Sequence, residues 1–273
     1  MIDHLKKDKV AFAAALAILA LILAALAAPL VAPYDPLRID LDALRHPPSW
    51  SHWMGTDNKG RDVLSRVLFG ARISLIVGVA ATAVSMVIGL LVGIVSGYMG
   101  GKVDSVLSAF TDMVMAFPSL LLAIGITVVL PPGLFTVMLA LAIVGWASFA
   151  RLSRGMVLSI KEMPYVEAAR ASGCTTGRVL LRHVLPNCLP LIIIAGSLKV
   201  GGFILAESAL SFLGLGAQPP TPTWGSMVSL SRNYILSAPW MVIFPGLAIA
   251  VTVLSFNILG DSLRDWLDPK MRV

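Results

Sequence analysis

The chain has 273 residues, of which 57% are hydrophobic and only 13% are charged, and its formal net charge is +6. About a quarter of the residues in a typical soluble domain are charged, so this composition excludes an ordinary water-soluble domain. The basic excess by itself would suit a nucleic-acid-binding protein, but Lys and Arg also gather in the cytoplasmic loops of membrane proteins, so their placement decides between the two.

Six apolar stretches are long enough to cross a bilayer core, which needs roughly 20 apolar residues per helix. They cover residues 10–33, 73–98, 103–130, 134–150, 189–210 and 240–259. The first could also be a secretory signal, because Ala25-Leu26-Ala27 resembles a cleavage site, but it exceeds the roughly 7–15 apolar residues of a signal core. The pattern predicts an all-α integral membrane protein with about six transmembrane helices.

The basic residues predict that both termini lie in the cytoplasm. Lys6, Lys7 and Lys9 precede the first span, and six spans return the segment 261–273 to the same side. The loop between the fourth and fifth spans then also lies inside, with Arg151, Arg154, Lys161, Arg170, Arg178 and Arg182. The outer segment 34–72 disagrees with this orientation, since it holds six basic residues, although five aspartates offset their charge. The predicted parts are therefore tails 1–9 and 261–273, an outer segment 34–72 and a membrane core 73–260.

The outer segment contains a predicted helix that would lie along the membrane surface before the second span. Asp57 is expected to cap this helix and Asp62 to pair with Arg66. Its apolar stripe would be Val63, Leu64, Val67 and Leu68. Two roles stay open for this helix: it anchors the bundle, or it also meets a protein that carries the substrate.

Charged residues inside membrane spans usually face a cavity or a partner, and three candidates of this kind stand out. They are Asp112, Lys199 and Glu207. Lys199 and Glu207 are eight residues apart, about 12 Å along a helix, which is too far for a direct pair. We expect these residues to line a translocation path, to form pairs (Lys199 with Asp112 or another subunit) or to snorkel to an interface. Gly89 and Gly93 form a GxxxG pair typical of close helix packing.

The loop 161–186 predicts two short helices. Pro164 suits a first helical position, Glu167 a first turn and Gly173 a helix end. Thr175 or Thr176 can cap the second helix, and Pro186 is expected to stop it before the next span. The small residues of the first helix would let it lie close to another protein's surface; a surface helix at the lipid boundary is the alternative.

Sequence motifs for enzymatic chemistry are missing. A P-loop requires GxxxxGK followed by Ser or Thr, whereas Gly101-Lys102 is followed by Val103. The chain has neither HExxH nor an intramembrane-protease GxSG, and its four histidines are scattered. His46 and His52 would contact a metal substrate or stay unpaired at the surface. We expect Cys174 and Cys188 to be free thiols in a reducing compartment, and no cofactor to be bound.

Glu167-Ala168-Ala169, Gly173 and Leu185-Pro186 resemble the EAA loop of bacterial ABC importer permeases. Two further runs, Gly55-Thr56-Asp57 through Ser74-Leu75 and Glu207 through Gly216, are similar to the C-type permease of oligopeptide, dipeptide and nickel importers. The family usually has an aliphatic residue where this chain has His183, which leaves the helix register open. The resemblance implies the type I importer fold in the bacterial inner membrane, and a loop that couples to an ATPase through Glu167, Ala168, Ala169, Arg170, Gly173, Leu185 and Pro186.

The same resemblance implies the partners: two ATPase subunits that bind ATP and Mg²⁺, a second homologous permease in a heterodimer, an extracytoplasmic solute-binding protein and the lipid bilayer. No nucleic acid is expected. We hypothesise a non-enzymatic permease subunit that imports di- or oligopeptides by ATP-driven alternating access. Import of nickel or a nickel chelate by the same machine is the near alternative, and a stand-alone ion-coupled transporter is a different class.

Overall fold

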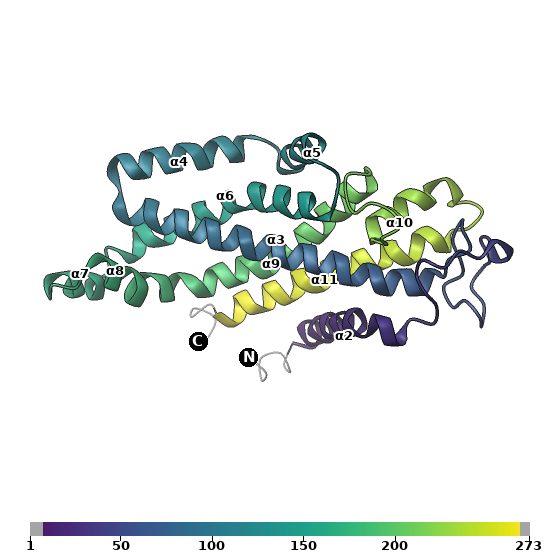
Figure 1. The fold of residues 1–273 in the computed structure, drawn as a ribbon. Coiled ribbons are helices and arrows are strands. Elements are labelled where there is room, and N and C mark those ends of the chain that lie inside the picture. Colours follow the sequence, from purple (N-terminus) through teal and green to yellow (C-terminus); the bar gives the residue numbers. More distant parts are fainter. Residues whose placement is uncertain (1–7, 268–273) are drawn as a thin grey trace.

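The computed structural model describes residues 8–267, which form a bundle of helices without a β-strand in that range (Figure 1). The long helices are α2 (Lys9–Val31), α3 (Val63–Met99), α4 (Gly101–Ala116), α5 (Ser119–Val129), α6 (Leu134–Ile160), α9 (Leu185–Phe212) and α11 (Trp240–Leu267). Shorter elements are η1 (Leu41–Ala43), α7 (Pro164–Ala171), α8 (Thr176–Val179), the π-helical turn η2 (Leu180–Val184), α10 (Trp224–Ser231) and η3 (Arg232–Tyr234).

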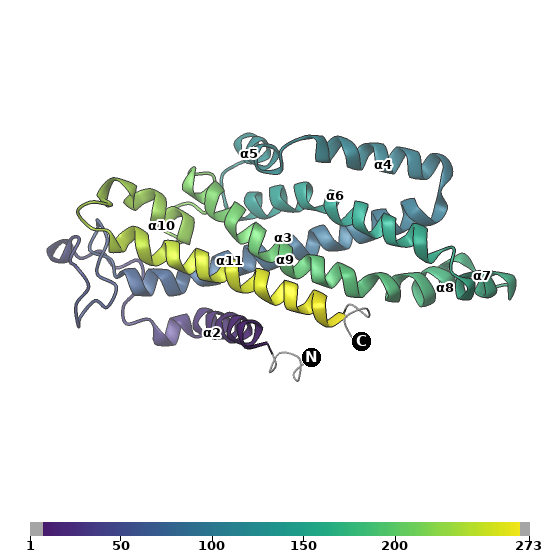
Figure 2. The ribbon, with the colours of Figure 1, turned by 180° about the vertical axis from the view of Figure 1, so that it is seen from behind.

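Five helical stretches are long and apolar enough to span a membrane, and the pair α4 and α5 makes a sixth if it counts as one span. The prediction of about six spans is thus confirmed. Figure 2 shows the bundle from behind, and both views put α7 and α8 at one end and the loops that follow α2 at the other. The residues Lys6, Lys7, Lys270 and Arg272, which support the predicted orientation, lie outside the described residues.

The predicted surface helix is instead the beginning of α3, which runs unbroken from Val63 to Met99. Its cap is Asp62, whose carboxylate accepts hydrogen bonds from the Ser65 amide at 2.8 Å and hydroxyl at 2.7 Å. Asp57, the predicted cap, pairs with Arg61 at 2.7 Å and faces Arg66 at 3.6 Å. The predicted cap is therefore wrong, because the turn at Gly60 moves the helix start past Asp57. The predicted pairing of Asp62 with Arg66 is wrong too, since Asp62 binds Ser65 and Arg66 faces Asp57.

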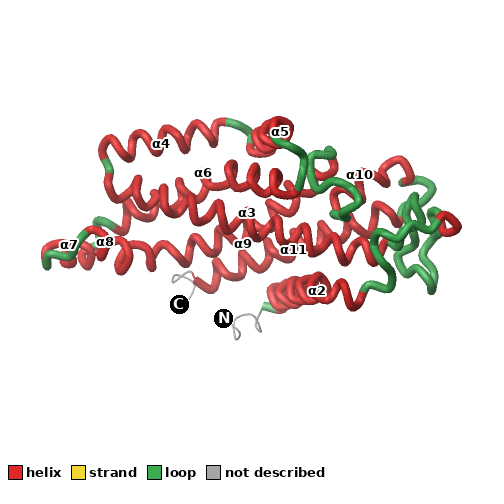
Figure 3. Tube along the Cα trace, in the orientation of Figure 1, coloured by secondary structure: helices red, strands yellow, loops and turns green. Residues whose placement is uncertain are grey.

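The predicted span 103–130 is broken into α4 and α5, whose axes differ by 87°. The break falls at Phe117 and Pro118, where Phe117 has an extended backbone. Proline disfavours the helical conformation of the residue before it, and this explains the end of α4. Figure 3 shows the result: α5 is seen nearly end-on, whereas α4 and α6 run lengthwise across the picture.

Helix α9 continues through Pro186, contrary to the prediction that this proline stops a helix. The stretch Thr176–Phe212 is helical throughout, with the π turn η2 just before Leu185. The Leu185 amide donates to the Leu180 carbonyl, five residues back rather than four. A proline lacks an N–H and crowds the carbonyl four residues earlier, and the wider π turn relieves both problems without ending the helix.

Helices α6 and α11 extend beyond the predicted spans, to Ile160 and Leu267. Arg151 and Arg154 therefore stand on α6 rather than in the loop. Their charges are balanced by two aspartates of α4: Arg151 pairs with Asp112, and Arg154 binds Asp104 through two hydrogen bonds of 2.6 and 2.7 Å. An apolar run marks the part of a helix that lipid or core covers, but backbone hydrogen bonding continues into polar residues.

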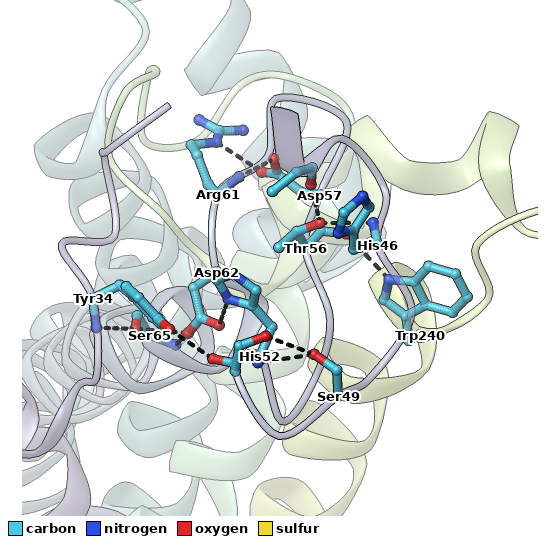
Figure 4. Close-up of polar contacts among 12 residues, drawn as sticks. Tyr34, His46, Ser49, His52, Thr56, Asp57, Arg61, Asp62, Ser65 and Trp240 are labelled. Carbon is cyan, nitrogen blue, oxygen red and sulfur yellow. Dashed lines mark hydrogen bonds and ion pairs between the residues drawn. The ribbon is translucent and has the colours of Figure 1, made fainter. Parts of the chain in front are cut away.

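The loop segment between α2 and α3 is held by polar contacts (Figure 4), in addition to the apolar contact of Met54 with a buried cluster. Thr56 receives a hydrogen bond of 3.1 Å from the Trp240 indole, which ties the loop to the start of α11. His52 lies 2.9 Å from Asp62 and packs on the Tyr34 ring. Arg66 donates to the Pro36 carbonyl at 3.0 Å. Much of the charge that disagreed with the orientation rule is thus used internally.

Candidate functional site

Helix α7 begins and ends at the residues that the sequence predicts. Pro164 occupies the first helical position, where a missing N–H costs nothing. At the other end Gly173 has φ of +77°, the Gly173 amide donates to the Arg170 carbonyl, and the Cys174 amide donates to the Ala169 carbonyl. This pair of bonds is a Schellman motif, which favours glycine because other residues resist positive φ.

One face of α7 is anchored in an apolar cluster that joins it to three long helices. This cluster, called the loop cluster below, consists of Ile94, Val157, Ile160, Val166, Val179, Val184 and Cys188, all buried. Val166 is the α7 member, and Ala169 and Leu185 pack against the same group. Because the other members come from α3, α6, α8, η2 and α9, the cluster joins α7 to three of the long helices.

The face of α7 that carries Glu167 and Ala168 is open. Both residues are exposed, and the Glu167 carboxylate has no ion-pair partner in the described part of the chain. Arg170 is exposed too, but it follows Val166 by four residues and so lies on the anchored side of the helix. The Arg170 guanidinium lies 5.0 Å from the centre of the Tyr98 ring, which fixes its stem against the end of α3. Pro186 is exposed as well. A two-faced helix with small, open side chains is suited to contact a second protein.

The open question of register at His183 is settled by burial. Val184 is fully buried in the loop cluster, whereas His183 is partly exposed and its ring lies 6.3 Å from the Tyr165 ring. Val184 therefore supplies the aliphatic contact. Thr175 takes the cap position of α8, but its side chain makes no capping hydrogen bond.

The three charged residues of the predicted path do not come together. Asp112 is exposed and paired with Arg151, so its suggested pairing with Lys199 is not formed. Glu207 is fully buried, and its carboxyl oxygens accept hydrogen bonds from Ser74 at 3.0 Å and Ser211 at 2.7 Å. Lys199 lines a cavity between α5, α6 and α9, whereas Asp112 lines a separate, smaller pocket between α3, α4 and α6.

The pair of Asp104 and Arg154 was missed by sequence reasoning. Asp104 also accepts hydrogen bonds from the Ser96 and Ser108 hydroxyls, so it links α3, α4 and α6. The sequence offered one indication of this pair, the acidic Asp104 at the start of an apolar stretch. Nothing local indicates that its partner lies 50 residues further on.

Metal binding finds no support in residues 8–267, where no group of three His, Cys, Asp or Glu side chains is placed to hold an ion. His52 is engaged by Asp62 and so is not the unpaired surface residue suggested as one alternative. Cys174 and Cys188 are free thiols, as predicted.

Comparison with known proteins identifies two family matches. Residues 89–273 match the family described as binding-protein-dependent transport system inner membrane component. Residues 1–48 match the N-terminal transmembrane domain of oligopeptide transport permease C. The first match covers most of the chain and includes α7, α9 and α11.

Individual relatives are similar over nearly the whole length. The chain is 45% identical to the dipeptide transport system permease protein DppC of Alkalihalophilus pseudofirmus, over 98% of this chain and 88% of the relative. It is 44% identical to the glutathione transport system permease protein GsiD of Pectobacterium atrosepticum, over 97% and 89%. It is 41% identical to the oligopeptide transport system permease protein OppC of Bacillus subtilis, over 98% and 88%.

The fold is similar to that of a solved importer. An inward-facing structure of the MetNI methionine ABC transporter matches 75% of this chain and 98% of its own, with a TM-score of 0.60 and 18% sequence identity. At this identity the likeness concerns the fold alone, and it agrees with the expected importer architecture.

Proposed function

Because the chain belongs to the family of binding-protein-dependent transport system inner membrane components, we propose that it is the permease subunit of an ATP-driven importer of di- and oligopeptides. The observation that carries this proposal is the two-faced helix α7, with Val166 buried in the loop cluster and Glu167 exposed. Such a helix can receive a push on one face and pass it to the bundle through the other.

The power source is a pair of ATPase subunits that dock on the exposed face of α7. The chain has no P-loop of its own, and a binding-protein-dependent system needs a source of work. ATP and Mg²⁺ bind to those partners. A second, homologous permease completes the pathway, and a solute-binding protein delivers the substrate at the end of the bundle opposite α7.

The membrane orientation follows from the position of α7. Docking to ATPases requires the α7 end to be cytoplasmic, and the basic residues Lys161, Arg170, Arg178 and Arg182 near it agree with the positive-inside rule. Both termini then lie in the cytoplasm, and the loop segment tied to Trp240 lies outside.

The substrate class is peptides. The relatives described above carry names of dipeptide, oligopeptide and glutathione systems. No observation on this chain favours the nickel alternative, since residues 8–267 hold no metal-ligating cluster. The buried position of Glu207 and the pairing of Asp112 give an ion-coupled mechanism no support either.

The docking role is tested by reversing one charge on α7. In the complex assembled with its partner subunits, Glu167→Arg should lower the amount of co-purified ATPase about tenfold, as expected for roughly 1.4 kcal/mol of lost binding. Glu162→Arg is the matched control, because Glu162 is also exposed but precedes α7. Peptide and nickel uptake are then measured in proteoliposomes with the binding protein. Equal ATPase recovery for both variants, or uptake that persists with inactive ATPase, contradicts the proposal.

A further inference from the structure

Lys199 stands near the middle of α9, 14 residues after Leu185 and 13 residues before Phe212. At 1.5 Å per residue it is about 20 Å from either end of the helix. A lysine at the centre of a membrane helix costs roughly 2.5–3.5 kcal/mol on insertion scales. Its charge therefore requires a polar environment or a partner that lipid does not provide.

No carboxylate of the described residues provides that partner. Asp112 is held by Arg151, Asp104 by Arg154, and Glu207 by serine hydroxyls. The amine of Lys199 lies 5.4 Å from the centre of the Phe203 ring, one turn along the same helix. A cation–π contact of this kind contributes only about 0.5–2 kcal/mol, so it orients the amine without replacing a counter-ion.

Lys199 lines a cavity of about 200 Å³ between α5, α6 and α9. The lining residues are mostly apolar and include Leu120, Leu141, Val144 and Phe203, beside Ser119 and Lys199. Lys199 is the only charged residue among them, and Ser119 is the only other residue with a polar side chain. Ser119 and Leu120 are the first two residues of α5, and backbone amides in a first helical turn add to the preference for a negative group.

We infer that Lys199 is a substrate-binding residue that receives the terminal carboxylate of a transported peptide in this cavity, an inference that rests on the proposed function. The cavity is smaller than the roughly 300–1,000 Å³ of a drug-sized pocket, so it takes one end of a peptide and not the whole. Every unmodified peptide carries an α-carboxylate whatever its sequence. One cation among apolar walls recognises that shared group without selecting side chains.

The test compares trialanine with trialanine amide, which lacks the terminal carboxylate. ATP-dependent uptake is measured in proteoliposomes that hold the complete importer, at peptide concentrations that saturate the binding protein. Lys199→Met removes the charge and keeps the length, Lys199→Arg keeps the charge, and Lys102→Met removes an exposed lysine at the start of α4 as the control. Subunit content is quantified for each variant.

The expected result is a selective loss: Lys199→Met lowers trialanine uptake about tenfold, equivalent to roughly 1.4 kcal/mol, and changes amide uptake less than twofold. Lys199→Arg and Lys102→Met should transport trialanine at near wild-type rates. Undiminished trialanine uptake by Lys199→Met, or an equal loss for both peptides, overturns the inference. Loss of the second permease from the Lys199→Met complex also overturns it, because Lys199 would then be an interface residue. If the wild-type importer transports neither peptide, the proposed function itself fails.

Discussion

Glu207 lies in the packed interface between α3 and α9, where three serine hydroxyls surround its carboxyl group. Ser74 comes from α3, and Ser208 and Ser211 come from α9, so the group joins two spanning helices. A buried polar group that finds its hydrogen-bond partners is tolerated, whereas one that loses them carries the full cost of desolvation. The role of Glu207 suggested by this geometry is structural.

At this residue we predict different outcomes for two substitutions. Glu207→Gln keeps an oxygen that accepts hydrogen bonds and should lower the thermal unfolding midpoint in detergent only slightly. Glu207→Leu leaves the Ser74 and Ser211 hydroxyls without their acceptor and should destabilise the protein by about 1–3 kcal/mol per unsatisfied group. Equal losses of stability for both variants would show that the hydrogen bonds accepted by Glu207 do not stabilise the protein.

Helices α3 and α6 pack closely because small residues face each other along the crossing. A Cβ atom added at Gly93 would lie 1.9 Å from Ser153 Oγ and 2.5 Å from the Ala150 carbonyl oxygen. Ser153 in turn donates to the Gly89 carbonyl across the interface at 3.1 Å. The GxxxG pattern is thus used for close approach of two backbones, as the sequence suggested.

For these elements we predict that Gly93→Ala separates α3 from α6. The cost should be about 1–3 kcal/mol, the usual range for forcing extra atoms into a packed core. Gly155→Ala on α6 is the control, since no atom lies within 4 Å of its added Cβ, and alanine suits a helix better than glycine. Melting temperatures of both variants in detergent check this, and a smaller effect at Gly93 than at Gly155 would refute it.

For the molecule as a whole, the two ends of the bundle are built differently. At the α7 end the loop cluster joins α3, α6 and α9 by apolar contacts, while at the opposite end ion pairs and hydrogen bonds of the segment between α2 and α3 add to an apolar cluster around Met241. The contacts that tie α7 to the long helices are therefore mainly apolar.

We predict that Val166→Asp uncouples the importer without releasing its ATPase. A carboxylate does not fit the loop cluster, so α7 should detach from the bundle while its exposed face stays intact. ATPase co-purification should stay within about twofold of wild type, a difference below 0.5 kcal/mol, and peptide uptake should fall at least tenfold. Val166→Thr, which has nearly the same shape, should show an intermediate loss. Parallel loss of docking and uptake in Val166→Asp would argue against separate roles for the two faces.

The amino-acid sequence by itself determined the number of spans and the ends of α7. Apolar length reports directly on membrane crossing, and Pro164 and Gly173 act on the backbone of their own neighbours. Local patterns also indicated the GxxxG contact. These features depend on residues within a few positions of one another.

Only the tertiary structure decided which charges meet. The pairing of Asp104 with Arg154 and the isolation of Lys199 from Asp112 both depend on residues brought together from distant parts of the chain. The continuation of the helix through Pro186 was also not evident from the sequence, and the structure shows it with a π turn beside two residues buried in the loop cluster, Val184 and Cys188. Local propensity is a weak preference, and burial against neighbouring helices outweighs it.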